Sequence, residues 1–133
     1  MLQRKFFYII RHCESVANRD SFISGQYDVA LTDTGQAQAK NLAESLMSIS
    51  PPPDYIVSSS LQRAYQTAAY MNRKAYLPLV SDDFLREQYF GDLQGVFKAD
   101  IHDLSQALMH PPGGESEQEF ESRVLRTWTH YLA

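Results

Sequence analysis

The stretch Phe6-Phe7-Tyr8-Ile9-Ile10 is a continuous apolar run, and the basic pair Arg11-His12 follows it directly. Five consecutive β-prone residues with no charged side chain among them are typical of a strand that is buried on both faces. Strands of this kind belong to parallel sheets that carry helices on either side. We therefore predict a buried first strand over residues 6–10, with Arg11 and His12 just beyond its carboxyl end.

Short apolar stretches alternate with amphipathic ones along the rest of the chain. Residues 55–57 and 79–80 predict two further strands, and apolar side chains at spacings of three and four predict helices with one buried face. These stripes are Ala39, Leu42, Ala43 and Leu46; Leu61, Ala64, Ala68 and Met71; Ile101, Leu104 and Leu108; and Phe120, Val124, Trp128 and Tyr131. Thr32 is a suitable N-cap for the first helix, and Pro51-Pro52-Pro53 would end it. The alternation predicts an α/β protein, a three-layer α/β/α arrangement with a mainly parallel sheet.

Length and composition favour one soluble domain over residues 1–133. Hydrophobic residues make up 44% of the chain and charged residues 21%, which is ordinary for a globular protein. The net charge of -4 gives no electrostatic basis for binding nucleic acid or an anionic membrane. No apolar run approaches the roughly 20 residues that span a bilayer. The single cysteine, Cys13, cannot form an internal disulfide, so we expect a reducing, cytoplasmic setting.

Polar residues follow two of the predicted strands. Arg11-His12 comes after the first and Ser58-Ser59-Ser60 after the second. Ligands of open parallel sheets bind beyond the carboxyl ends of the strands. We therefore expect a site where these two segments meet.

Five motifs occur in order along the chain: Arg11-His12-x-Glu14-Ser15-x-x-Asn18; Leu31-Thr32-x-x-Gly35-x-x-Gln38-Ala39; Ser58-Ser59-x-Leu61-x-Arg63-Ala64-x-Gln66-Thr67-Ala68; Leu85-x-Glu87-x-x-x-Gly91-x-Leu93-x-Gly95; and Pro112-Gly113-Gly114-Glu115-Ser116. Each motif is weak alone, but the five together and in this order resemble the histidine phosphatase superfamily. That superfamily includes the cofactor-dependent phosphoglycerate mutases. The resemblance extends over residues 6 to 128.

The resemblance implies hydrolysis of a small phosphomonoester through a phosphohistidine. His12 would attack phosphorus, splitting one difficult step into two. Glu87 would protonate the leaving oxygen and then deprotonate water. The residues that the resemblance assigns to substrate binding are Arg11, Asn18, Ser24, Gly25 and Arg63. No metal or other cofactor is expected, because arginines would hold the charge of the phosphoryl group.

A rival signature uses the same residues. His12-Cys13 followed by Arg19 matches the bare pattern of cysteine-dependent tyrosine phosphatases, in which Cys13 would be the nucleophile. The intervening loop, residues 14–18, has no glycine, and Glu14 adds a negative charge near a dianion. The histidine hypothesis is therefore favoured, although the superfamily usually has glycine at the position of Cys13.

The superfamily also has a second pocket histidine, in a Ser-His-Gly run, and the 133 residues contain no such run. The remaining histidines, His102, His110 and His130, lie off the apolar stripes and are expected to be solvated. In the superfamily, the strand that carries the second histidine lies beside the first one. Without it, residues 6–10 would have an unpaired edge. We expect a domain that is truncated at its C-terminus, with an inactive natural fragment and a strand supplied by a partner chain as alternatives.

Two other functions remain open from the sequence. A phosphoglycerate-type mutase is one, but the mutases carry a longer, arginine-containing insertion after the Glu87 loop. Here Gly95 reaches Pro111 quickly, and Lys98 is the only Lys or Arg between them. The other is a non-catalytic phosphate-binding module. The sequence identifies neither the phosphomonoester nor the oligomeric state, and a homo-oligomer is compatible with it.

Overall fold

The computed structural model describes residues 5–133. Its sheet consists of two parallel strands, β1 (Ile56–Ser59) and β2 (Leu79–Asp82), which pair in register from Ile56 opposite Leu79 to Ser59 opposite Asp82. Helix α3 (Gln62–Met71) connects the two strands. The predicted second and third strands, their parallel arrangement and the helix between them are confirmed, but each strand extends two residues further than predicted, so Ser58 and Ser59 lie within β1 and not beyond it.

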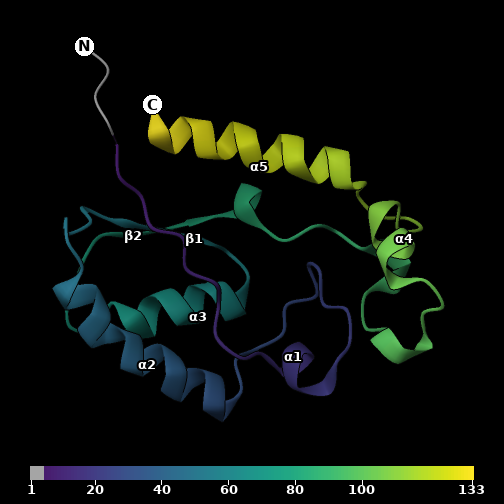
Figure 1. The fold of residues 1–133 in the computed structure, drawn as a ribbon, viewed down its shortest axis with the longest axis horizontal. Coiled ribbons are helices and arrows are strands. Elements are labelled where there is room, and N and C mark those ends of the chain that lie inside the picture. The colour runs from purple at the N-terminus through teal and green to yellow at the C-terminus, as the bar shows by residue number, and fades with distance from the viewer. Residues whose placement is uncertain (1–4) are drawn as a thin grey trace.

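The helices form a layer on either side of the sheet. Helix α2 (Asp33–Ser48) packs on α3 below the strands in Figure 1, and α5 (Glu117–Leu132) crosses above them. The hydroxyl of Tyr131 in α5 donates to a carboxylate oxygen of Asp82 at 2.6 Å, which ties the helix to the end of β2. The α/β class and the three-layer arrangement are therefore confirmed.

Helix α2 begins where the sequence predicts. The hydroxyl of Thr32 accepts a hydrogen bond from the backbone N–H of Gly35 at 3.0 Å, as an N-cap does. Ala39 and Ala43 are fully buried on the side that meets α3. The helix ends at Ser48, before the prolines. Small side chains at these positions let the two helices approach closely.

The rest of the chain consists of short helices and turns. They are α1 (Val16–Asp20), the 3₁₀ turns η1 (Asp83–Leu85), η2 (Gly91–Leu93) and η3 (Lys98–Asp100), and α4 (Leu104–Met109). Ser15 and Asn18 form a capping box at the start of α1, and Ser116 and Glu119 form another at the start of α5. No helix in residues 5–133 is long and apolar enough to cross a membrane.

The prediction of a buried strand at residues 6–10 is wrong for this structure. The segment runs as an extended coil, and the purple trace in Figure 1 shows no arrow. Phe6 and Ile9 are each 73% exposed. An apolar run becomes a strand only when a neighbour satisfies its backbone groups, and the sheet among the described residues consists of β1 and β2 alone.

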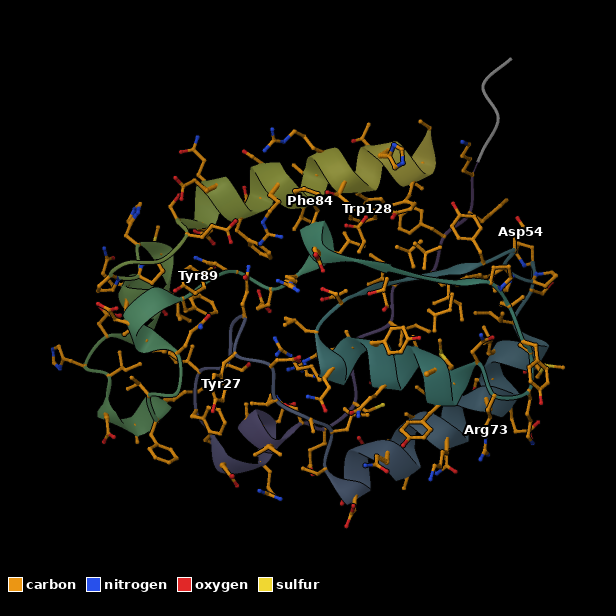
Figure 2. All side chains as sticks on the ribbon, turned by 180° about the vertical axis from the view of Figure 1, so that it is seen from behind. Tyr27, Asp54, Arg73, Phe84, Tyr89 and Trp128 are labelled. Atoms are coloured by element: carbon orange, nitrogen blue, oxygen red, sulfur yellow. The ribbon has the colours of Figure 1, made fainter. Side chains whose placement is uncertain are left out.

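This extended segment is held by one aromatic contact and by two hydrogen bonds, from the hydroxyl of Tyr8 to the carbonyl oxygen of Pro51 at 3.0 Å and from Lys5 Nζ to the carbonyl oxygen of Ala133. The ring of Phe7 meets the ring of Trp128 edge to face, with centroids 5.1 Å apart. Trp128 lies on the sheet-facing side of α5 (Figure 2). The approach to His12 is thus fixed by a helix from the other end of the chain.

Candidate functional site

A pocket of about 200 Å³ lies where the carboxyl end of β1 faces the segment after β2. Among the described residues, its walls are His12, Ser59, Leu61, Arg63, Ala64, Leu85, Arg86, Glu87, Phe120 and Val124. The pocket therefore brings together three of the residues that the sequence singles out: His12, Arg63 and Glu87. A larger hollow of about 510 Å³ lies beside α5 and contains none of the predicted site residues.

The imidazole of His12 is half-buried and is oriented by its neighbour's backbone. Its Nδ1 atom lies 2.7 Å from the carbonyl oxygen of Cys13. Because a carbonyl only accepts, Nδ1 must carry the hydrogen. In the neutral ring, Nε2 then has the free lone pair. The backbone of Cys13 thus fixes the tautomer that a nucleophilic histidine needs.

The surroundings of His12 favour its neutral form. Burial lowers the pKa of His12 most, and the positive charges of Arg63 and Arg11 lower it further. The carbonyl of Cys13 and the carboxylate of Glu87 oppose this by raising it, and the net pKa shift is downward. An imidazole whose pKa is lowered is neutral, and able to attack, near pH 7.

Arg63 is a buried cation at the start of α3, with only 3% of its surface exposed. Its Nη2 donates to the carbonyl oxygen of Gly25 at 2.7 Å, and its Nη1 donates to that of Tyr27 at 3.3 Å. Gly25 has a φ of 52°, and a Cβ there would collide with the side chain of Phe90 and the carbonyl of Gln88. Glycine is therefore required at the turn that orients the guanidinium of Arg63.

Glu87 follows η1 and places an exposed carboxylate at the rim of the pocket. One of its oxygens accepts the backbone N–H of Gln88 at 2.8 Å. Its own carbonyl oxygen accepts the side-chain amide of Gln26 at 3.1 Å. Burial lowers the pKa of Arg63, and the carboxylate of Glu87 opposes this lowering, as it does at His12, so the three groups interact electrostatically.

The four other predicted residues lie outside the pocket wall, and Gly25 is the one of them that contacts Arg63. Arg11 is exposed and acts on His12 through its charge. The side-chain oxygen of Asn18 accepts from the backbone N–H and the hydroxyl of Ser15, each at 2.9 Å, so this oxygen caps α1. The carbonyl oxygen of Ser24 accepts the backbone N–H of Tyr27 at 2.7 Å within a turn. The structure thus gives Asn18 and Ser24 local roles, and their predicted binding roles remain predictions.

Arg86, which was not predicted as a site residue, lines the pocket beside Glu87. Its Nε donates to the hydroxyl of Ser60 at 2.8 Å, and its Nη2 lies 3.1 Å from a carboxylate oxygen of Asp83. These contacts fix a second guanidinium beside the pocket. The sequence could have indicated a role for Arg86, because it lies between Leu85 and Glu87 in the fourth motif.

The geometry argues against Cys13 as the nucleophile. Burial raises the pKa of its thiol, which disfavours the reactive thiolate. Its backbone N–H donates to Thr67 Oγ1 at 3.0 Å, instead of turning toward a phosphate. Arg19, the arginine of the rival signature, forms an exposed ion pair with Asp20 at 2.8 Å. The loop that a cysteine-dependent phosphatase needs is therefore not formed.

His102, His110 and His130 are exposed, as predicted, and none lines the pocket of His12 within the described part of the chain. Nor do residues 5–133 gather three His, Cys, Asp or Glu side chains in a way that could hold a metal ion.

Comparisons with known proteins identify the family of the chain and related structures. A model of the Histidine phosphatase superfamily (branch 1) matches residues 7–133. A Schizosaccharomyces pombe protein named as a probable phosphatase is 33% identical over 126 residues, which cover 94% of this chain and 59% of that protein. A 2,3-bisphosphoglycerate-dependent phosphoglycerate mutase of Nocardia farcinica is 39% identical over 98 residues, covering 71% of this chain and 40% of the mutase. The crystal structure of the alpha-ribazole phosphatase from Shigella flexneri has a TM-score of 0.79 and 32% identity, and the match covers 92% of this chain and 64% of that one.

The fold and the pocket define an α/β protein with a polar site at the carboxyl end of a parallel sheet. The chain belongs to the histidine phosphatase superfamily, branch 1. It spans 59% of the length of the Schizosaccharomyces pombe relative and 64% of the Shigella flexneri structure.

Proposed function

We propose that this protein hydrolyses a small phosphomonoester through a phosphohistidine on His12. The observation that carries the proposal is the pocket that His12, Arg63 and Glu87 share. The hydrogen bond from His12 Nδ1 to the carbonyl of Cys13 leaves Nε2 free to attack. Relatives named as phosphatases support the same activity.

The reaction would proceed in two displacements. His12 Nε2 forms a bond to phosphorus while the ester P–O bond breaks, and the carboxylic acid of Glu87 gives its proton to the leaving oxygen. Glu87, now a carboxylate, takes a proton from water, whose oxygen attacks phosphorus as the P–N bond breaks. Inorganic phosphate leaves and His12 is restored. Arg63 and Arg11 would stabilise the charge on the transferring group, with Asn18, Ser24 and Gly25 on the substrate side and no metal required.

A mutase activity remains the second candidate, because relatives include phosphoglycerate mutases. A mutase must also hold a second anionic group of its substrate. The chain from Gly95 to Pro111 forms η3 and α4, and its Lys98, His102 and His110 are all exposed. This segment therefore offers little to hold a second phosphate or a carboxylate, and hydrolysis is favoured.

The proposed setting of the reaction follows from composition. A single free cysteine suits a reducing cytoplasm. The net charge of -4 suits a small anionic substrate bound in a local cationic pocket better than it suits a nucleic acid. Self-association of the chain is compatible with this proposal.

Trapping of the phosphoenzyme tests the proposal. The full chain is mixed with 4-nitrophenyl phosphate and quenched, and the adduct is tested for stability. A phosphohistidine is labile in acid and stable in base, and it should disappear in His12→Ala while persisting in Cys13→Ser. The reverse pattern would assign the chemistry to Cys13. Absence of any adduct and of turnover would support the non-catalytic phosphate-binding module instead.

A further inference from the structure

The guanidinium of Arg123, in α5, lies largely shielded from solvent and uses all five of its N–H groups. Its Nη1 donates to the carbonyl oxygens of Phe84 at 2.7 Å and Arg86 at 2.9 Å, and its Nη2 donates to that of Glu87 at 3.2 Å. Its Nε and Nη2 donate to the two carboxylate oxygens of Glu115, at 2.8 and 2.9 Å. A side chain on the last helix therefore holds three carbonyls around the predicted acid.

Glu115 holds the backbone that follows Glu87 in the sequence. Its carboxylate accepts the backbone N–H of Tyr89 at 3.0 Å, and its backbone N–H donates to the carbonyl of Tyr89 at 2.7 Å. The buried amide of Gln88 donates to the carbonyl of Glu115 at 2.8 Å. The backbone is therefore held on both sides of Glu87, by Arg123 before it and by Glu115 after it.

We propose that Arg123, paired with Glu115, is the positioning residue for the carboxyl group of Glu87. The inference rests on the proposed function, since it assigns Glu87 to proton transfer. The side chain of Glu87 is exposed, so packing does little to direct it. Fixing the backbone from Phe84 to Tyr89 sets the direction of its Cα–Cβ bond, and proton transfer is sensitive to displacements of a fraction of an ångström.

The ion pair is suited to this task. Its two side chains are only 17% and 15% exposed, and both arms of the guanidinium fork are engaged, so the geometry is defined in two directions. A lysine at position 123 would keep the charge but would lose the fork. Arg123→Lys therefore tests the planar fork separately from the charge. Glu115→Gln makes the corresponding change in the carboxylate that pairs with Arg123.

The test compares two substrates with different leaving groups. 2,4-Dinitrophenyl phosphate needs no proton on its leaving oxygen, whereas phenyl phosphate does. General acid catalysis contributes about 10²–10⁴-fold, and kcat/KM reports the steps up to release of the leaving group, so we expect Arg123→Lys to lower kcat/KM for phenyl phosphate by about 10-fold or more. The same variant should change kcat/KM for the dinitrophenyl ester by less than about 3-fold. Arg126→Lys, three residues further along α5, is the matched control and should affect neither substrate.

A second measurement is independent of turnover. Hydrogen exchange of the amides of residues 84–89 should become faster in Arg123→Lys and Glu115→Gln, while that of α2 and α3 stays unchanged. Equal losses in kcat/KM for both substrates, or unchanged kcat/KM for both, would overturn the positioning role. If the unaltered chain hydrolyses neither ester, the proposed function fails. Exchange then decides the inference, and unchanged exchange at residues 84–89 overturns it.

Discussion

The α-carbon of Gly35 lies directly against the backbone carbonyl of Glu14, so that a Cβ at position 35 would collide with the carbonyl oxygen. The contact joins the first turn of α2 to the loop that carries His12. Two hydrogen bonds reinforce it: the backbone N–H of Thr32 donates to the same carbonyl at 3.0 Å, and the hydroxyl of Thr32 donates to the carboxylate of Glu14 at 2.7 Å. The nucleophile loop is thus seated on the start of a well-packed helix.

Gly35→Ala should therefore destabilise the protein. In an ordinary helix this change stabilises by roughly 0.5–1 kcal/mol, because glycine is a poor helix former. Here the methyl group meets backbone that cannot move aside without displacing His12, and we expect a loss of about 2 kcal/mol. Urea unfolding measures the sign, and Thr34→Ala, at an exposed neighbouring position, should stay within about 0.5 kcal/mol. If Gly35→Ala were more stable than the unaltered protein, the backbone of Glu14 would have to move aside at little cost in free energy.

The midpoint of the titration of His12 should lie below pH 6.5. Burial lowers its pKa most, and Arg63 and then Arg11 add to the effect. Removing one of these charges in Arg11→Gln should move the midpoint upward, and Arg11 is exposed, so the fold is unaffected. Nuclear magnetic resonance of the imidazole follows this directly. Because the unfolded chain binds the proton more readily, stability should fall as the pH drops from about 6.5 toward the folded pKa. A midpoint at or above 6.5 would contradict the assigned environment.

Arg63→Lys should weaken both the fold and phosphate binding. A lysine keeps the charge but cannot donate to the carbonyls of Gly25 and Tyr27 together, and a hydrogen bond from a charged donor contributes about 1.5–3 kcal/mol. Calorimetry with inorganic phosphate should show weaker binding, and thermal unfolding should show a lower Tm. Arg73→Lys is the control, because Arg73 is exposed beyond the other end of α3 (Figure 2). Unchanged phosphate affinity in Arg63→Lys would remove Arg63 from the pocket's function.

Phe7→Ala should loosen the segment that leads to His12. The edge-to-face pair of Phe7 and Trp128 is worth about 0.5–1.5 kcal/mol beyond its buried area. Trp128 is the one tryptophan of the sequence, so its fluorescence reports on this contact without labelling. Phe6→Ala is the matched control, since Phe6 is 73% exposed. If both variants gave the same emission and the same stability, the contact would contribute nothing.

The sequence predicts the parts of the fold that depend on local patterns. Thr32 at the start of α2 and the strands at residues 56–59 and 79–82 follow from capping and periodicity, which involve neighbouring residues. The run at residues 6–10 shows the limit of this reasoning. Its composition suits a strand, but pairing depends on another segment, and composition carries no information about whether that segment is present.

The sequence likewise predicts some residues of the site and misses others. The rule for ligands at strand ends predicted only that Arg11-His12 and residues 58–60 lie together, and the grouping of His12 with Arg63 and Glu87 was implied by the resemblance to the histidine phosphatases. Arg123 was not predicted, because an arginine on a helix with a polar outer face is usually solvated. Only the fold shows that its guanidinium faces the carbonyls around Glu87. Glu115 did stand in a recognised motif, but its partner lies eight residues away on another element.

The way α5 holds the molecule has a consequence for the order of folding. Contacts among α2, β1, α3 and β2 lie within residues 33–82, which are all made before α5. Those of α5 join its end to Phe7 and Asp82, and its first half to the residues around Glu87. Long-range contacts form late, after the loops between them have closed. During synthesis, the two-layer unit of sheet and helices can therefore assemble well before the pocket does. A newly made chain would be compact but would have an incomplete pocket until α5 docks, because Phe120 and Val124 of that helix form part of its wall.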